Sequence, residues 1–338
     1  MEVSMDIKEL NLYLKKYAMP DNKKVAYQML NTLLPYLLTM TILMYLANRG
    51  VNYFVLLPLS LAASCFMVRL FILFHDCTHK SFVKTSKWNT ILGNIFGVLV
   101  FTPYLAWQKE HNIHHSAVGN LDKRGIGDIW MLTVEEYKNS SKLTRFFYRV
   151  FRSPMFLFTV APIFLFAVIN RVPKRKASTS ELFNYLISNL GIVFLGILLS
   201  SVFTFKVYII YQITVLAFAA TMGVWLFYIQ HQYDEVYWEE SKSWQIVDAA
   251  LKGSSYYKLP LVFEWISGYI GYHHIHHLNS RIPNYNLKEC YQGIEFLKDI
   301  RTVTLAESFR LAYLQFYDEK ERKLITYKEL KTILKKAA

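Results

Sequence analysis

Residues 51–79 read VNYFVLLPLSLAASCFMVRLFILFHDCTH, an apolar run that continues without a break into two histidines. A helix that spans a bilayer needs about 20 mostly apolar residues, and residues 51–74 are long enough. His75 and His79 are four residues apart, so they share one face of a helix. The stretch therefore predicts a membrane helix that delivers two imidazoles to one side of the bilayer.

Three further segments are long and apolar enough to cross a membrane. They are residues 29–47, 186–204 and 207–230. Short turns at residues 48–50 and 205–206 join the spans into two helical hairpins. Hydrophobic residues make up 53% of the 338 residues, which is more than a soluble domain normally carries. We therefore predict an all-α integral membrane protein with four transmembrane helices.

The distribution of charge predicts the sidedness of the spans. Lys and Arg outnumber Asp and Glu by 38 to 25, and nearly all lie outside the two hairpin turns. By the positive-inside tendency, both termini and a helical cap of residues 75–185 and 231–338 should be cytoplasmic. We treat residues 1–338 as one domain. Three scattered cysteines fit a reducing compartment.

Two shorter apolar stretches, residues 91–106 and 155–169, are interrupted by Gly or Pro. We expect them to be re-entrant or to lie in the membrane interface, because a crossing would separate the histidine clusters. The net charge of +13 would attract anionic lipids or an acidic redox partner. No basic motif with interleaved aromatic residues points to nucleic acid. The charged tail, residues 318–338, is expected to be a solvated amphipathic helix or to help dock a partner.

All ten histidines fall in four places along the chain. HDCTH occupies residues 75–79, HNIHH residues 111–115 and HHIHH residues 273–277, whereas His231 stands alone directly after the last span. Positions i, i+3 and i+4 share a helix face, and His274 lies off that face. The facially matched candidate ligands are His75, His79, His111, His114, His115, His273, His276 and His277. A lone histidine such as His231 is more often a surface or core residue than a ligand.

So many imidazoles are too many for one metal ion and about right for two. A structural zinc site uses four ligands and often cysteine, and the chain has neither an HExxH nor a Glu-x-x-His motif. Imidazole also binds copper and nickel, but iron best suits oxygen chemistry. A metal transporter is disfavoured, because the spans hold one charged residue, Arg69, and no histidine.

The three clusters resemble the histidine boxes of membrane fatty acid desaturases. GNLDKRGIGDIWMLTVEEY (119–137), YIQHQYDEVYW (228–238) and GYHHIHHLNSRIPNYNL (271–287) are similar to the bacterial acyl-lipid branch, and the resemblance covers about residues 30–290. It implies two iron ions and adds His231 to the ligands named above. Members sometimes carry a water-bridged Asn one turn before the lone histidine, where this chain has Phe227.

The resemblance also implies a reaction and a location. The expected reaction introduces a double bond into an acyl chain, expected to be lipid-linked, with O2 as co-substrate. The expected location is a bacterial inner membrane. The sequence contains no haem-binding or ferredoxin-like segment, so electrons should come from a separate ferredoxin or cytochrome b5-like protein. An acyl or lipid hydroxylase on the same scaffold is the alternative.

Residues around the boxes complete the predicted site. An apolar tunnel should hold the acyl chain, and its candidate lining is Trp107, Trp130, Trp225 and Tyr228. Anchoring at the membrane interface is the other role such aromatic residues take. Candidates to orient the ligand rings from behind are Asp76, Asp122, Asp128, Asp234 and His274. Helix caps and surface charges are the alternative for the aspartates.

Overall fold

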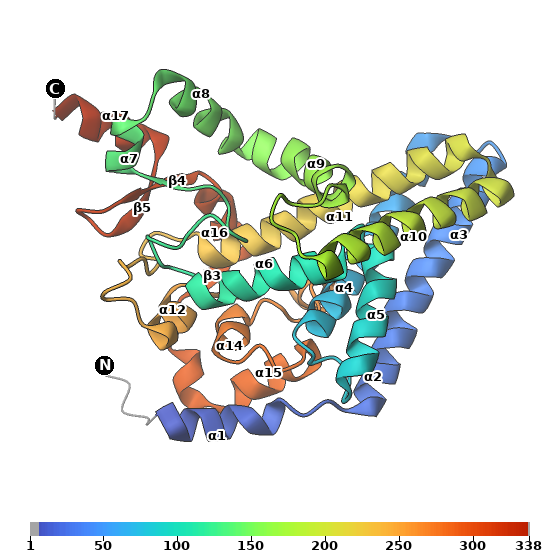
Figure 1. Ribbon diagram of the computed structural model, residues 1–338, viewed down its shortest axis with the longest axis horizontal. Helices are drawn as coiled ribbons and strands as arrows, with labels where there is room; N and C mark the ends of the chain where they lie inside the picture. Colours follow the sequence, from blue (N-terminus) through green and yellow to red (C-terminus); the bar gives the residue numbers. More distant parts are fainter. Residues whose placement is uncertain (1–6, 337–338) are drawn as a thin grey trace.

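The computed structural model describes residues 7–336, so the extreme ends of both predicted cytoplasmic termini lie outside the described residues. Within that range, four helices are long and apolar enough to cross a membrane, which confirms the predicted helical membrane class (Figure 1). They are Asn22–Asn48, α4 (Tyr53–Thr78), α10 (Thr179–Phe203) and α11 (Phe205–His231). The first comprises α2 (Asn22–Gln28), a π-helical turn (Met29–Leu33) and α3 (Leu34–Asn48).

The two hairpins have very short turns. Gly50, with φ of 83°, lies in the turn between α3 and α4. Thr204 alone separates α10 from α11, with φ of 75°, and its hydroxyl accepts a hydrogen bond from the amide of Val207. The predicted turn at residues 205–206 is therefore wrong by one position, because the left-handed conformation of Thr204 reverses the chain and Phe205 already begins α11.

The two shorter apolar stretches are bent. Helix α5 (Ser86–Leu99) meets α6 (Tyr104–Ala117) at 102°, and α8 (Lys142–Phe151) meets the segment Phe156–Arg171 at 61°. Phe101 has a φ of 56° and Pro103 precedes the first turn of α6, so the helix cannot continue through this point. Both bends agree with stretches that do not pass straight through a bilayer.

The remaining elements form the cap on the opposite side from the hairpin turns (Figure 1). Besides α6 and α8, its helices are α1 (Ile7–Tyr17), α7 (Val134–Asn139), α12 (Ile246–Lys252), α13 (Leu261–Ile266), α14 (His273–Leu278), α15 (Asn284–Gly293), α16 (Leu305–Leu311) and α17 (Tyr327–Lys336), with a 3-10 turn at Glu295–Lys298. Helix α9 (Ala161–Ala167) and the 3-10 turn at Ile169–Arg171 belong to the bent apolar stretch, and α9 packs beside α11. Its strands are β1 (Leu132–Thr133), β2 (Tyr256–Lys258), β3 (Thr302–Thr304), β4 (Leu314–Asp318) and β5 (Lys323–Thr326).

The strands form two small sheets, ordered β1–β4–β5 and β2–β3. The β4–β5 pair is antiparallel, whereas β1–β4 and β2–β3 are parallel. The prediction of a helical tail over residues 318–338 is therefore only partly right: residues 323–326 pair with β4, and the helix begins at Tyr327. Buried Leu324 and Ile325 explain the strand, because they pack into the cap.

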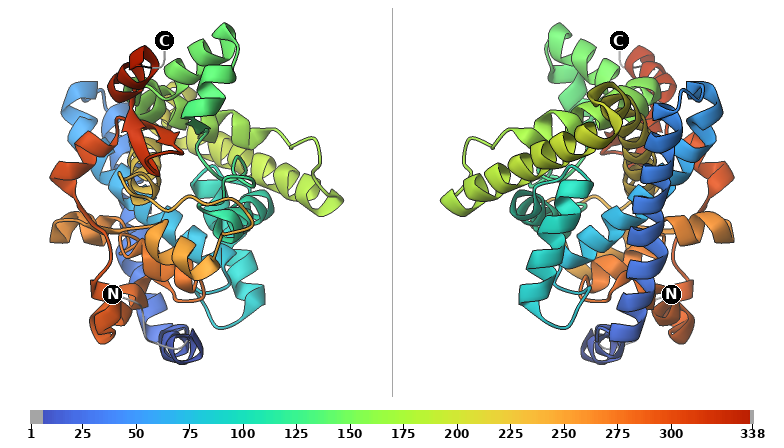
Figure 2. Two further views of the ribbon diagram at one scale, coloured as in Figure 1. Left: turned by 90° about the vertical axis from the view of Figure 1, so that its left-hand side faces the viewer. Right: turned by 90° about the vertical axis from the view of Figure 1, so that its right-hand side faces the viewer.

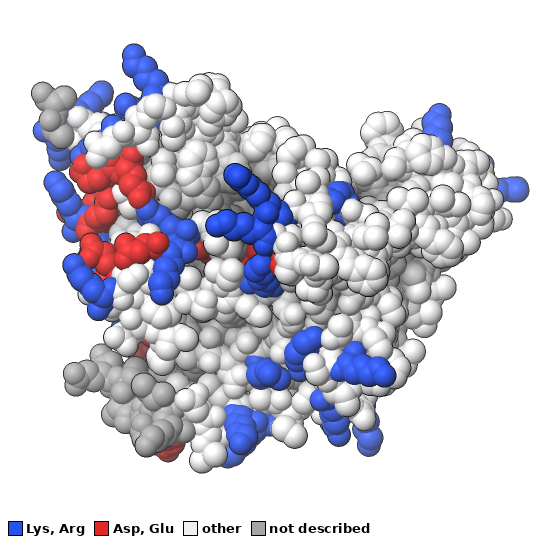
Figure 3. Space-filling model, in the orientation of Figure 1, with Lys and Arg blue, Asp and Glu red and all other residues white. Residues whose placement is uncertain are grey.

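Helix α4 is the centre of the molecule. It packs against α3, α5 and α11, and its residues Leu70, Leu73, Phe74 and Cys77 are fully buried. Helix α10 stands at the edge of the group (Figure 2). It exposes apolar side chains along its length. Charged side chains gather over the cap, and the surface of the long helices is nearly free of them (Figure 3). This division is the one expected of a protein that is partly embedded in a bilayer.

Candidate metal centre

Four helices bring the histidines together where the hairpins meet the cap. The apolar run of α4 ends in His75, and His79 follows the helix directly. His231 is the last residue of α11. Helix α6 carries His111, His114 and His115, and α14 carries His273, His276 and His277. The two spans thus fix the depth at which the site lies, and the two cap helices close it.

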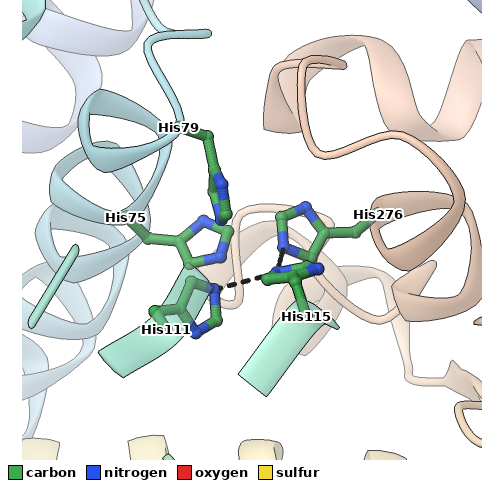
Figure 4. A group of neighbouring side chains, drawn as sticks. All are labelled: His75, His79, His111, His115 and His276. Carbon is green, nitrogen blue, oxygen red and sulfur yellow. Dashed lines mark hydrogen bonds between the residues drawn. The ribbon is translucent and has the colours of Figure 1, made fainter. Parts of the chain in front are cut away.

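Nine histidines form two groups, and in each group the ligand atoms lie within 4.8 Å of one another. The five-histidine group contains His75, His79, His111, His115 and His276, whose rings turn toward a common centre (Figure 4). His115 Nε2 lies 3.1 Å from His111 Nε2 and 2.9 Å from His276 Nε2. The Nε2 atoms of His75 and His79 are buried and have no hydrogen-bond partner among residues 7–336.

The four-histidine group contains His114, His231, His273 and His277. His231 Nε2 lies 3.2 Å from His114 Nε2 and 2.9 Å from His273 Nε2. His277 Nε2 lies 3.2 Å from His273 Nε2. The two groups adjoin, because the rings of His115 and His277 stack with centroids 4.2 Å apart.

Hydrogen bonds behind the rings decide which nitrogen faces the centre. His231 Nδ1 donates to the carbonyl of Gly253 at 2.8 Å, and His114 Nδ1 lies 2.6 Å from a carboxylate oxygen of Asp128. With their protons at Nδ1, both rings turn an Nε2 lone pair toward each other. Two lone pairs at 3.2 Å repel unless a cation lies between them.

The donor set therefore fits metal ions. Metal–nitrogen bonds of about 2.0–2.1 Å separate neighbouring nitrogens by roughly 3 Å, which matches the observed Nε2 spacings. Burial lowers the pKa of six imidazoles well below its usual value, and the neighbouring imidazoles lower it further; the six are His79, His111, His115, His273, His276 and His277. Neutral rings are the form that binds a metal. The residues present suit two metal ions with nitrogen ligands.

Asp76 supports the five-histidine group from behind. Its Oδ1 atom lies 3.2 Å from His75 Nδ1, and its Oδ2 atom accepts from the amide and the side chain of Asn284 at 2.6 and 2.8 Å. Gln28 donates to the side-chain oxygen of Asn284 at 2.6 Å. All four residues are buried, so this chain of contacts fixes the tautomer and the orientation of His75.

The other predicted supports differ from the expectation. Within residues 7–336, Asp122 accepts from the Ser241 amide and Asp234 pairs with Arg310 at 2.6 Å, and neither carboxylate contacts a histidine ring. Their predicted role behind the ligands is wrong, because both lie on cap loops that turn away from the site. His274 is fully buried and belongs to neither group; its ring lies 6.0 Å from that of Tyr291. A position at the surface is therefore excluded, and a role in orienting the ligand rings remains a prediction.

The predicted tunnel residues lie in different surroundings. Trp107 stacks on His111 with ring centroids 4.2 Å apart and also contacts His75. Trp130 packs against Tyr148, and Trp225 packs against Phe158.

Tyr228 and Phe227 line a cavity beside the four-histidine group, together with His114, Asp128 and His231. Its volume of about 20 Å³ holds one water molecule and not an acyl chain. Phe227 lies one turn before His231, and its ring is 5.1 Å from that of His114 and 5.4 Å from that of His231.

Sequence reasoning missed three contributors: Asn284, Gln28 and the carbonyl of Gly253. Gln28 and Asn284 are 256 residues apart, and a backbone carbonyl leaves no mark on side-chain patterns. The only signal was the segment NSRIPNYNL (279–287), which contains Asn284 and follows the last histidine cluster directly.

The fold and the site define a helical membrane protein with a buried, histidine-rich centre for two metal ions. The family model for fatty acid desaturases matches residues 51–297. A fatty acid desaturase of Bacillus subtilis is 40% identical over 326 residues, which cover 96% of this chain and 92% of that protein. The chain belongs to the fatty acid desaturase family and is an oxidoreductase.

More distant relatives carry more specific names. An sn-1 oleoyl-lipid 12-desaturase of Synechocystis is 26% identical, over 67% of this chain and 64% of that protein. An sn-1 acyl-lipid omega-3 desaturase (ferredoxin) of Nostoc is 28% identical, over 67% of this chain and 63% of that protein. The chain thus spans a little under two thirds of the length of these two relatives.

Proposed function

We propose that the chain desaturates lipid-linked acyl chains with O2 at a di-iron centre held by the nine histidines. The observation that carries the proposal is the pair of adjacent imidazole groups whose lone pairs converge in a buried site. Two bound iron ions would supply the oxidising power that removes hydrogen from an unactivated methylene group. In the balanced reaction, O2 takes two hydrogens from the chain and two electrons and two protons from outside, and gives two waters.

The residues of the chain have separate tasks in this proposal. His114 and His231 keep their protons at Nδ1, on Asp128 and on the Gly253 carbonyl, so that Nε2 remains a ligand. Asp76 performs the same task for His75. Trp107 covers the five-histidine group and would contact the acyl chain, and Phe227 packs against the rings of His114 and His231 and helps to hold them in place.

The proposal also includes an electron donor and the orientation of the protein in the membrane. The Nostoc relative is named for ferredoxin, which supports a ferredoxin as the separate electron donor here; a cytochrome b5-like protein is the alternative. The charged cap and the nearly uncharged long helices support a cytoplasmic site and cytoplasmic termini. We further propose a bacterial inner membrane as the location; the similarity to a desaturase from a bacterium over nearly the whole chain supports a bacterial membrane.

Expression in a host that lacks desaturases, followed by gas chromatography–mass spectrometry of its lipids, tests the function. We expect new monounsaturated acyl chains in the membrane lipids, and none with the His276→Ala variant. Hydroxylated chains without unsaturation would establish the hydroxylase alternative. Saturated lipids only, from a metal-loaded protein supplied with reduced ferredoxin, would refute both.

A further inference from the structure

Helix α8 carries an apolar face that nothing in the described chain covers. Leu143, Phe146, Phe147 and Val150 are exposed by 65, 52, 55 and 40% of their surfaces. Their spacing of i, i+3, i+4 and i+7 aligns them on one side of the helix. Four large apolar side chains together on an exposed helix indicate a surface that binds something apolar.

The other side of α8 is fixed to the cap. Tyr148 is fully buried, and its hydroxyl accepts from the Leu132 amide at 3.0 Å and donates to the Gln315 carbonyl. The orientation of the apolar face is therefore set by the fold, so the face cannot rotate inward.

Two basic residues border the apolar face. Lys142 and Arg149 lie beside it on α8, whose sequence KLTRFFYRVF contains no acidic residue, whereas Arg145 lies on the Tyr148 side of the helix. In the part of the chain that the structure describes, none of the three forms an ion pair with a carboxylate. Arg149 bonds only neutral groups, the Tyr327 hydroxyl and the Arg145 carbonyl. Their positive charge is available to an anionic surface.

The apolar face continues toward the membrane-spanning part of the molecule. After the 61° bend, the segment Phe156–Arg171 exposes Val160, Phe164 and Val168. Figure 1 shows α8 and α9 following one another along the same edge, with α9 beside α11. A lipid surface that contacts α11 and α9 would therefore also contact the exposed apolar residues of α8.

We propose that α8 lies in the plane of the membrane interface, with its four apolar side chains among the acyl chains and its basic residues at the phosphates of anionic lipids. An amphipathic helix bordered by Lys and Arg binds this boundary by apolar burial and by charge. The inference rests on the proposed cytoplasmic cap, because anionic headgroups must face the same side as α8.

The contacts that fix α8 to the cap also connect this helix to the metal centre. Arg152, the residue after α8, is fully buried. Its guanidinium donates to the Tyr228 hydroxyl at 2.9 Å and to the Gln232 side chain at 3.3 Å, on either side of His231. It also donates to the carbonyl of Trp130, two residues after Asp128. The lipid contact is thus joined by one side chain to the segments that hold the four-histidine group.

Spin labels in the full-length protein, reconstituted in vesicles of phosphatidylcholine and phosphatidylglycerol, test the proposal. One cysteine at a time is added at Phe147, Asn139 or Phe194, in a Cys65→Ala background whose remaining Cys77 and Cys290 are buried. The three positions report the apolar face, the exposed end of α7 and the lipid-facing side of α10. At position 147 we expect collisions with a water-soluble nickel complex to be roughly fivefold rarer than at 139, and collisions with O2 to be as frequent as at 194.

Two results would overturn the proposal. Nickel access at 147 equal to that at 139 would show that water covers α8, and exclusion of both nickel and O2 would show that protein covers it. Pure phosphatidylcholine vesicles, or the Lys142→Gln, Arg149→Gln variant, should increase nickel access at 147; unchanged access would refute the role of charge. These readouts need neither metal nor turnover, so they fail independently of the desaturase assay.

Discussion

The five-histidine and four-histidine groups share two helices and differ in the third. Helices α6 and α14 contribute to both groups, whereas α4 contributes only to the first and α11 only to the second. Each membrane hairpin therefore ends in a different group. The supports differ as well: Asp76 and Asn284 are buried by helices, while Asp128 and Gly253 lie on loops beside a water-sized cavity. We therefore expect the two groups to differ in rigidity, with the four-histidine group the looser.

The largest expected effect is the loss of metal when one histidine is removed from either histidine group. His276→Ala should remove the metal from the five-histidine group and lower the metal content toward one ion per chain, because His276 faces His75, His79 and His115. His274→Ala is the matched control in the same helix and should keep both ions. Elemental analysis of the folded proteins measures this. Equal loss in both variants would remove the distinction between the two residues.

The next largest effect on metal affinity should come from Asp76, the buried residue that contacts His75. Asp76→Asn should weaken metal binding at the five-histidine group by roughly 10–100-fold, because His75 loses the acceptor that orients it. Asp122→Asn, the control, should leave the affinity unchanged, since its carboxylate binds the Ser241 amide on a loop. Competition with a coloured chelator reports the affinity. An Asp76→Asn protein with wild-type affinity would show that the contact does not orient the ligand.

A smaller difference should separate the two sites in the unmodified protein. We expect a chelator to release metal in two phases, with the four-histidine site emptied first because loops support it. Asp128→Asn should accelerate the fast phase only, since Asp128 contacts His114 alone among the histidines of the described chain. Stopped-flow absorbance measures both phases. A single phase, or acceleration of the slow phase, would argue against unequal sites.

The sequence predicted which histidines converge but not how they divide. Neighbours such as His114 and His115, or His276 and His277, point about 100° apart on a helix. Each triplet therefore spreads over a broad face, and the fold sends its members to both groups. Helical periodicity alone places the three histidines of a triplet on one face and does not predict which group each of them joins. The division depends on where α4 and α11 end relative to each other, which is a property of tertiary packing.

The four spans were predictable because apolar length decides them, and the small strands were not. Residues 323–326 alternate too briefly to signal a strand, and β5 forms only because β4 lies beside it. Likewise, Asn284 reaches Asp76 across 208 residues of chain, a contact that no local pattern encodes.

The smallest expected effect concerns the residue beside the cavity. Phe227→Leu should leave both metals bound and lower the free energy of unfolding by about 1 kcal/mol, because the ring packs against His114 and His231 without bonding to them. Thermal unfolding in detergent and metal content measure the two outcomes. Loss of metal would instead mean that Phe227 is needed to hold the ligand rings in place.

The central claim is that nine histidines hold two iron ions, and elemental analysis of the fully reconstituted wild-type protein tests it most directly. Two groups of converging imidazoles predict two metal ions per chain, and the proposed oxygen chemistry predicts that both are iron. One ion or fewer per chain after complete reconstitution, or two ions of another metal in the active protein, would contradict the account.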